Sequence, residues 1–144
     1  MTQIDFYFNV ADKLVTACRI AAKAYGLGNR MLVLCPDGET ATRIDRMLWT
    51  TPATGFIPHC SPRDPLAAET PIIVDHGTQE PVGDQVLLNL RAEWPPFFAR
   101  YERLVEIVSA DDEADKQAAR ERFRFYRERG YEIRRHDLAG AQSA

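Results

Sequence analysis

The sequence predicts an α/β fold with a mostly parallel sheet, and three observations lead to this prediction. Strand and helix patterns alternate from the start of the chain, as they do where helices connect parallel strands. Two short segments, RMLVLC at 30–35 and LVEIV at 104–108, are almost continuously apolar, which is typical of strands buried on both faces. A long segment of good helix formers, Asp112–Tyr131, lies near the C-terminus.

The first half of the chain contains two strand–helix pairs. Apolar and polar residues alternate in Gln3–Val10, which predicts a strand, and an apolar stripe at helical spacing runs through Ala11–Tyr25. A strand at Arg30–Cys35 and a helix at roughly Glu39–Leu48 repeat the arrangement. Consecutive pairs of this kind predict right-handed crossovers between parallel strands.

Two glycines at the end of the first helix do not form a nucleotide site. Gly26 and Gly28 follow a helix, whereas the dinucleotide-binding glycine turn follows a strand, so we interpret them as a helix cap. No phosphate-loop motif occurs elsewhere. The predicted fold is therefore Rossmann-like without a nucleotide-binding loop.

Prolines at 52, 58, 62, 65, 71 and 81 divide the middle of the chain into short elements. The segment Asp75–Asp84 is expected to be a turn or loop. Residues 1–138 are expected to form a single domain, and the small, polar residues 139–144 a disordered tail. The other predicted elements are strands at Phe56–Pro58, Ile72–Val74, Gln85–Leu90, Leu104–Val108 and, at a sheet edge, Tyr131–Asp137, with a short helix at Pro95–Tyr101.

Composition excludes several classes of protein. The 144 residues carry a formal net charge of −3, so the chain as a whole is not a polyanion binder. No apolar run approaches the ~20 residues that cross a bilayer, and the N-terminus does not resemble a signal peptide. The three cysteines, Cys18, Cys35 and Cys60, are odd in number and far apart, which indicates reduced thiols and a cytoplasmic location.

The sequence contains no recognisable catalytic or metal-binding set. Its histidines and cysteines have no metal-ligand spacing, and His59 is expected to be a polar residue on a surface loop. None of the three serines lies in a nucleophile elbow. We therefore expect no enzyme activity, no metal and no cofactor.

A basic stripe distinguishes the predicted helix Asp112–Tyr131. Four basic residues share an arc of roughly 80° on a wheel of about 100° per residue: Lys116, Arg120, Arg124 and Arg127. Phe123 borders this arc, and Glu121 and Glu128 are expected to lie away from it, so that they do not neutralise the bases.

Two interpretations of the stripe remain open. A basic surface beside an aromatic ring suits an acidic ligand with an apolar end. The alternative is a solvated basic face on a helix that packs through Ala119, Phe123 and Tyr126.

A second candidate site is the pair of aromatic residues Trp49 and Phe56. They flank one short connection after the second helix. They could belong to the core, or they could be exposed anchors of the kind that dominate protein interfaces. The sequence alone does not decide between these alternatives.

Several segments resemble a known family when they are taken in order. They are DFYFNV, RMLVLCPD, RIDRMLWTTPATGFIPHC, PFFARYERLVEIV and ARERFRFYRERGYEI. In this order and spacing they resemble the chi subunits of bacterial DNA polymerase III, over residues 3 to 137. The most specific pieces are LW-x5-GFIPH and the ARERFRFYRERGY helix.

The resemblance implies a three-layer α/β/α domain and a non-catalytic accessory subunit of the polymerase holoenzyme, associated with the clamp loader. It also implies two binding surfaces. Lys116, Arg120, Phe123 and Arg124 match the positions that bind the acidic C-terminal tail of single-stranded-DNA-binding protein. Trp49 and Phe56 match the positions that hold the psi subunit or, in some species, a helicase. The segment Asp75–Asp84 agrees least with the family, and no function is assigned to it.

Two other functions compete with this interpretation. The basic helix could bind nucleic acid directly, but the net negative charge and the lack of aromatic residues that look exposed between the bases of the helix argue against it. A small hydrolase-like or nucleotide-binding enzyme would need a glycine loop, a nucleophile or a metal set, which the sequence lacks.

Overall fold

The computed structural model describes residues 1–50, 56–77 and 81–139. Within these ranges seven strands form one sheet in the order β3-β4-β2-β5-β6-β1-β7, and each neighbouring pair is parallel. The strands are β1 Gln3–Val10, β2 Met31–Cys35, β3 His59–Cys60, β4 Ile72–His76, β5 Val86–Asn89, β6 Arg103–Ser109 and β7 Ile133–Asp137. The helices are α1 Lys13–Gly26, α2 Gly38–Thr50 and α3 Glu113–Glu128, with single 3₁₀ turns at η1 Ala67–Glu69 and η2 Phe98–Arg100.

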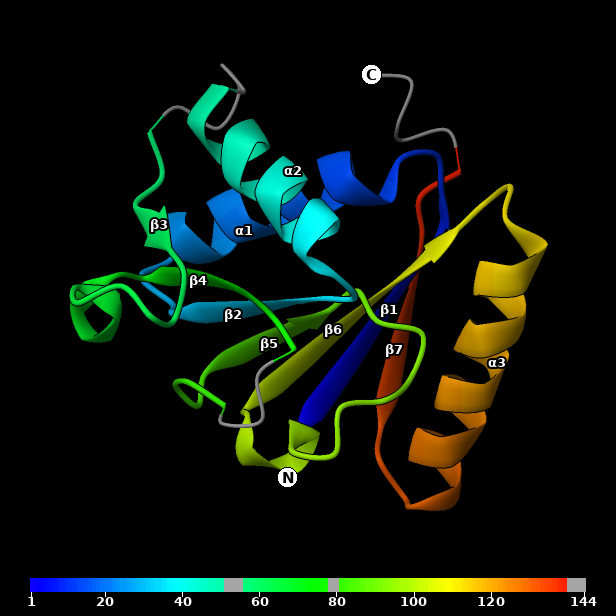
Figure 1. Cartoon of the computed structure of the whole chain (residues 1–144). Helices are drawn as coiled ribbons and strands as arrows, with labels where there is room; N and C mark the ends of the chain where they lie inside the picture. Colours follow the sequence, from blue (N-terminus) through cyan, green and yellow to red (C-terminus); the bar gives the residue numbers. More distant parts are fainter. Residues whose placement is uncertain (51–55, 78–80, 140–144) are drawn as a thin grey trace.

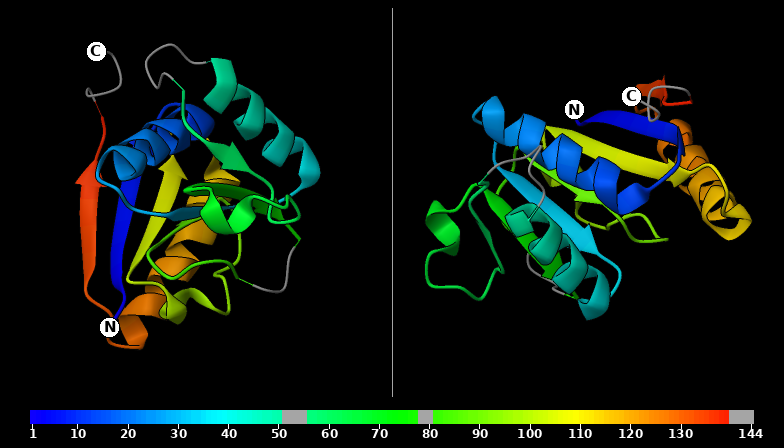
Figure 2. Two further views of the ribbon diagram at one scale, coloured as in Figure 1. Left: turned by 90° about the vertical axis from the view of Figure 1, so that its left-hand side faces the viewer. Right: turned by 90° about the horizontal axis from the view of Figure 1, so that it is seen from above.

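The elements are arranged in three layers. Helices α1 and α2 cover one face of the sheet, and α3 covers the other (Figures 1 and 2). Alternate side chains of each strand point to opposite faces, so one strand serves both layers. In β2, for example, Met31 and Val33 pack towards α1 and α2, while Leu32 and Leu34 pack on the side of α3. The fold is the predicted α/β/α arrangement, with a sheet that is parallel throughout its described strands.

The crossover from β6 to β7 places α3 above the first strand. Strand β1 lies between β6 and β7 in the sheet, and α3 connects these two strands. Asp112 caps the start of α3 by accepting a hydrogen bond from the backbone N–H of Asp115. The helix ends where Gly130 adopts a φ of +86°, a conformation that residues with a side chain rarely adopt. The cap and the glycine thus mark where α3 begins and ends.

Several element boundaries differ from those predicted. Phe56–Pro58 is not a strand, and the short edge strand β3 begins directly after it, at His59–Cys60. Asp75 and His76 belong to β4, since their backbones pair with β2, so the predicted loop begins later than expected. Residues 140–144 of the predicted tail lie outside the described residues. No helix in the described ranges is long and apolar enough to span a membrane.

Candidate functional site

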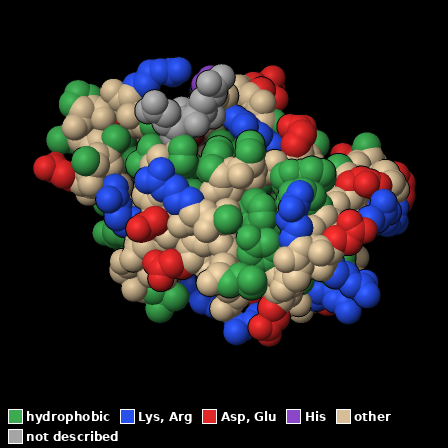
Figure 3. Space-filling model, turned by 90° about the horizontal axis from the view of Figure 1, so that it is seen from below, with side chains coloured by type: hydrophobic (Ala, Val, Ile, Leu, Met, Phe, Trp, Pro, Cys, Tyr) green, Lys and Arg blue, Asp and Glu red, His purple; other side chains and the backbone are tan. Residues whose placement is uncertain are grey.

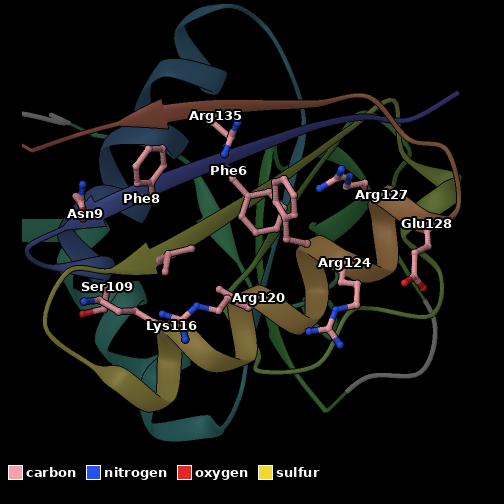
Figure 4. A pocket seen from close by; sticks show the side chains of 13 residues that line it. Phe6, Phe8, Asn9, Ser109, Lys116, Arg120, Arg124, Arg127, Glu128 and Arg135 are labelled. Carbon is pink, nitrogen blue, oxygen red and sulfur yellow. The ribbon is translucent and has the colours of Figure 1, made fainter.

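A groove of about 810 Å³ lies between α3 and the strands beneath it, and we call it the α3 groove (Figure 4). Its apolar lining comes from three elements: Phe6 and Phe8 of β1, Val108 of β6, and Ala119 and Phe123 of α3. The rings of Phe6 and Phe123 meet edge to face, with their centroids 5.4 Å apart. Together these side chains give the groove an apolar floor that is fixed by packing.

Basic side chains surround this floor on two sides. Figure 4 shows Arg135 on the side of the sheet, and Arg120 and Arg124 on the side of α3. The basic lining residues are Lys116, Arg120, Arg124 and Arg127 of α3 and Arg135 of β7. Glu128 is the acidic side chain among the described residues that line the groove. The site is therefore locally positive in a chain whose formal net charge is −3.

This positive charge is local. On the face that Figure 3 shows, basic and acidic side chains are interspersed around apolar ones. An acidic ligand would therefore be attracted to the groove in preference to a mixed surface of that kind.

Two of the bases have acidic neighbours on the same helix. The Nζ of Lys116 lies 3.3 Å from Glu113, and a guanidinium nitrogen of Arg124 lies 3.5 Å from Glu121. The prediction that Glu121 does not neutralise the stripe was therefore wrong, whereas Glu128 forms no ion pair with the stripe among the described residues. On the helical wheel Glu121 lies away from the centre of the basic arc. Residues three apart in sequence are nevertheless neighbours on the helix surface, so Glu121 reaches Arg124.

Three arginines have no such neighbour. Among the residues that the structure describes, Arg120, Arg127 and Arg135 form no ion pair with a carboxylate. Arg120 donates a hydrogen bond to the neutral amide oxygen of Gln117 at 3.0 Å. The guanidinium carbon of Arg135 lies 5.8 Å from the centroid of the Phe123 ring. These three guanidiniums can bind an anion without first releasing an acidic partner.

A buried polar cluster, which sequence reasoning missed, anchors α3 to the sheet. Arg122 is fully buried and donates to Glu106 of β6 at 3.0 Å, and the hydroxyl of Tyr126 donates to the same carboxylate at 2.6 Å. Asn89 of β5 also donates to Glu106, at 3.1 Å. The signal in the sequence was an acid in the centre of an otherwise apolar strand, LVEIV.

Burial of this cluster disfavours the charged forms of Glu106 and Tyr126. Burial raises the pKa of Glu106, while the charge of Arg122 and the hydrogen bonds from Tyr126, Asn89 and Arg122 itself counteract this. Burial and the nearby carboxylate also raise the pKa of Tyr126, whose hydroxyl therefore stays protonated. Removing one partner of a buried ion pair leaves the other charge uncompensated and strongly destabilises the folded protein. The pair therefore holds α3 against β6.

An ion pair and a hydrogen bond from the backbone also fix the start of α3. Asp115 accepts from Lys13 of α1 at 2.8 Å and from the backbone N–H of Ser109 at 2.8 Å. The groove is therefore bounded by a helix that is attached at its first turn and again at its centre.

The aromatic pair Trp49 and Phe56 lies on the surface. The two residues are 54% and 65% exposed, and their ring centroids are 5.1 Å apart. The structure therefore rules out the alternative that they belong to the core. This pair is on the face of the sheet that α1 and α2 cover, opposite the α3 groove.

His59 lies under this pair, and the prediction of a surface-loop histidine was wrong. It is only 8% exposed, and its ring centroid is 4.9 Å from that of Trp49. One ring nitrogen lies 2.7 Å from the carbonyl oxygen of Ile57, and the other lies 3.1 Å from Asp45 of α2. The ring therefore lies between Ile57 and α2 and is covered by Trp49.

No group of three or more histidine, cysteine or acidic side chains in the described ranges is arranged to hold a metal ion. The segment expected to be a loop, Asp75–Asp84, includes residues 78–80, which lie outside the described part of the chain.

Comparison with known proteins identifies the family. A family described as "DNA polymerase III chi subunit, HolC" matches residues 1–134. The DNA polymerase III subunit chi of Pseudomonas aeruginosa is 37% identical over 144 residues, covering 96% of this chain and 98% of the relative. The Escherichia coli protein of the same name is 31% identical over 117 residues, covering 81% and 79%. The Haemophilus influenzae protein of that name is 30% identical over 118 residues, covering 81% of each. The chain therefore belongs to the family of DNA polymerase III chi subunits.

Proposed function

We propose that this chain is a non-catalytic accessory subunit of the replicative DNA polymerase holoenzyme, associated with its clamp loader in the cytoplasm. In this role it binds the acidic C-terminal tail of single-stranded-DNA-binding protein and links it to the replisome through a second partner. The observation that carries the proposal is the α3 groove, where arginines without acidic partners surround an aromatic floor. Membership of the chi family supports the polymerase context.

The chemistry of such a tail fits the groove. An acidic peptide that ends in an aromatic residue and a free carboxylate needs an apolar surface next to guanidinium groups. Arginine forms paired, charge-assisted hydrogen bonds with a carboxylate, and these are stronger than bonds between neutral groups. Capture of a terminal carboxylate by basic groups is a common mode of peptide recognition.

The expected contacts have different roles. Arg120 pairs with the terminal carboxylate, because it is bonded only to a neutral amide in the free protein. Phe123 and Phe6 contact the apolar end of the peptide. Lys116 and Arg124 attract the acidic residues and accelerate encounter, although each must share its charge with a neighbouring glutamate.

The second surface is the exposed pair Trp49 and Phe56, which we propose as the anchor for psi or a helicase partner. Large aromatic side chains are enriched among the residues that dominate interface energies. The exposure of Trp49 predicts that Trp49→Ala leaves the fold intact and abolishes capture of that partner. Loss of the folded state in Trp49→Ala would instead show that the ring is needed for packing.

The tail interaction is tested by titrating a fluorescently labelled acidic tail peptide into the purified protein and following anisotropy. Loss of the Arg120 contact removes about 1.5–3 kcal/mol, so Arg120→Ala should weaken binding about tenfold to a hundredfold. Phe123→Ala should also weaken it, and Lys116→Ala should have a smaller effect than Arg120→Ala. A peptide with an amidated C-terminus should bind the wild type weakly.

Arg129 provides a matched control for this experiment. It lies on the continuation of α3, and its guanidinium is over the Phe125 ring, 4.3 Å from the centroid, instead of in the groove. Arg129→Ala removes the same charge and should bind the peptide as the wild type does. Unchanged binding by Arg120→Ala and Phe123→Ala, with the fold confirmed by circular dichroism, would place the tail elsewhere.

Direct binding of nucleic acid is the alternative function, and the same protein can test it. A direct binder should bind a bare single-stranded oligonucleotide, with affinity that falls steeply as salt increases. We expect the acidic peptide to bind and the oligonucleotide to bind far more weakly at the same ionic strength. The reverse order would favour the alternative.

A further inference from the structure

The edge strand β7 contributes one side chain to the α3 groove, and strand geometry determines which one. Successive side chains of a strand point to opposite faces. Ile133 packs with the core on the side of α3, and Arg135 lines the groove on that same side. His136 points the other way, where its ring stacks on Tyr7 with centroids 4.5 Å apart. Arg134, which alternates with Arg135, therefore faces away from the groove.

Arg135 is placed to contact a ligand from the sheet. It is exposed, and no carboxylate pairs with it among the residues that the structure describes. Its guanidinium is 5.8 Å from the Phe123 ring centroid, so it lies beside the apolar floor. Figure 4 shows it on the opposite side of the groove from Arg120 and Arg124. A ligand lying on the floor would thus have guanidinium groups on both sides.

We propose that Arg135 binds a carboxylate of the acidic tail from the sheet side, so that the peptide is held between α3 and β7. This inference rests on the proposed function, because it assigns a further binding residue to the same groove. The family resemblance assigned the contacts to α3 alone, whereas the pairing of β7 with β1 brings in a second element. β7 is the last described strand of the sheet, which leaves the groove accessible along this edge.

A guanidinium is better suited to this position than an ammonium. It can donate two parallel hydrogen bonds to one carboxylate while its flat face stays near an aromatic ring. Arg135→Lys keeps the positive charge but loses the paired donors. We therefore expect Arg135→Lys to bind the tail peptide more weakly than the wild type and more tightly than Arg135→Ala.

The adjacent residue offers a matched control. Arg134→Ala and Arg135→Ala remove the same charge from neighbouring positions, so general electrostatic attraction of the peptide falls similarly in both. Only Arg135→Ala removes a side chain from the groove. In anisotropy titrations at one ionic strength, we expect Arg135→Ala to weaken tail binding about tenfold and Arg134→Ala to weaken it by no more than about twofold.

The outcomes distinguish this inference from the proposed function. Equal affinities of Arg134→Ala and Arg135→Ala, with binding lost in Arg120→Ala, would overturn the role of Arg135 and leave the tail site on α3. Failure of the wild-type protein to bind the peptide would overturn both. Thermal unfolding of each variant shows whether an altered affinity reflects the groove or a damaged fold, and a variant of Arg135 that is folded yet weak in binding supports the inference.

Discussion

Immediate neighbours decide which basic side chains of α3 are available to a ligand. Arg124 shares its charge with Glu121, and Lys116 shares its charge with Glu113, whereas Arg120 is bonded to an amide. Exposed pairs of this kind are worth little in stability, so a ligand carboxylate can replace the glutamate at small cost. Arg120 needs no such exchange, which is why we expect its substitution to have the larger effect.

The cysteines differ in how well they are protected. Burial raises the pKa of Cys18 to about 11 and that of Cys35 to about 12, with nearby acids adding to the effect. Because the thiolate is the reactive form, both should resist modification in the folded protein. Cys60 is half-buried and should react. With a chromogenic disulfide reagent at pH 8, we expect one thiol to react in the native protein, none in Cys60→Ser, and all three after denaturation. Rapid reaction of two thiols in native Cys60→Ser would contradict this prediction.

Asp5 of β1 links stability to pH. Burial alone would raise its pKa, but hydrogen bonds from His136 at 2.8 Å and Arg103 at 2.7 Å outweigh burial and hold the pKa below its ordinary value of 3.8. A group whose pKa is lowered by folding adds stability that is complete above its unfolded-state pKa. This stability is lost as the pH falls through the folded-state pKa.

Asp5→Asn should therefore lower the free energy of unfolding near neutral pH by about 1.5–3 kcal/mol, since it removes hydrogen bonds to a charged group. The difference from the wild type should shrink as the pH falls below about 4, where Asp5 of the unfolded chain begins to take up a proton while Asp5 of the folded protein is still charged. Urea unfolding of both proteins at a series of pH values measures this difference. A difference that stays constant from neutral to strongly acid pH would exclude the proposed linkage.

At the scale of elements, the position of α3 depends on the cluster around Glu106. Replacing Arg122 by Met leaves the carboxylate of Glu106 buried without its cation, and such a change typically costs about 3–5 kcal/mol. Arg122→Met should therefore be strongly destabilised in urea unfolding. It should also lose tail binding if the helix no longer lies over Phe6.

The double variant Glu106→Gln with Arg122→Met is the control for this prediction. It removes both charges, so no uncompensated carboxylate remains, and it should recover part of the lost stability. If the loss of unfolding free energy in the double variant equalled the sum of the losses in the two single variants, the two side chains would not be coupled through their charges.

The elements that sequence analysis predicted best are those with strong local signals. The apolar run at 30–35 forms β2, and the helix predicted at Asp112–Tyr131 forms α3 at Glu113–Glu128 with its glycine cap. The edge strand at His59–Cys60 was predicted too early in the chain, at Phe56–Pro58, because a strand of two residues has no periodic pattern in the sequence. The ring of His59 is buried through contacts with Asp45 and Trp49, which local polarity does not show.

At the scale of the whole molecule, the groove combines residues that are far apart in the sequence. The basic stripe of α3 could be predicted from helical spacing, and Phe123 with it. Phe6 and Phe8 reach the groove because β1 lies between β6 and β7, and Arg135 reaches it because β7 pairs with β1 in parallel register. These pairings join segments about 100 residues apart for β1 with β6 and 129 for β1 with β7, and the periodicity within one segment does not predict them.

The two proposed surfaces lie on opposite faces of the sheet, which suits a protein that links two partners. The α3 groove is on one side, and Trp49 and Phe56 are on the side of α1 and α2. A partner at one surface would therefore leave the other accessible. This arrangement supports the proposal that the chain connects DNA covered by single-stranded-DNA-binding protein to the polymerase assembly.

The most direct test of the central claim is a titration of isotope-labelled protein with the unlabelled acidic tail peptide, followed by the backbone amide resonances in two-dimensional NMR. If the tail binds in the α3 groove, the largest shifts will fall on three segments: the end of β1 from Phe6 to Asn9, α3 from Lys116 to Glu128, and β7 around Arg135. The amides near Trp49 and Phe56 will then stay unchanged. Shifts that cluster around Trp49 and Phe56, or that are absent at saturating peptide, would contradict the account.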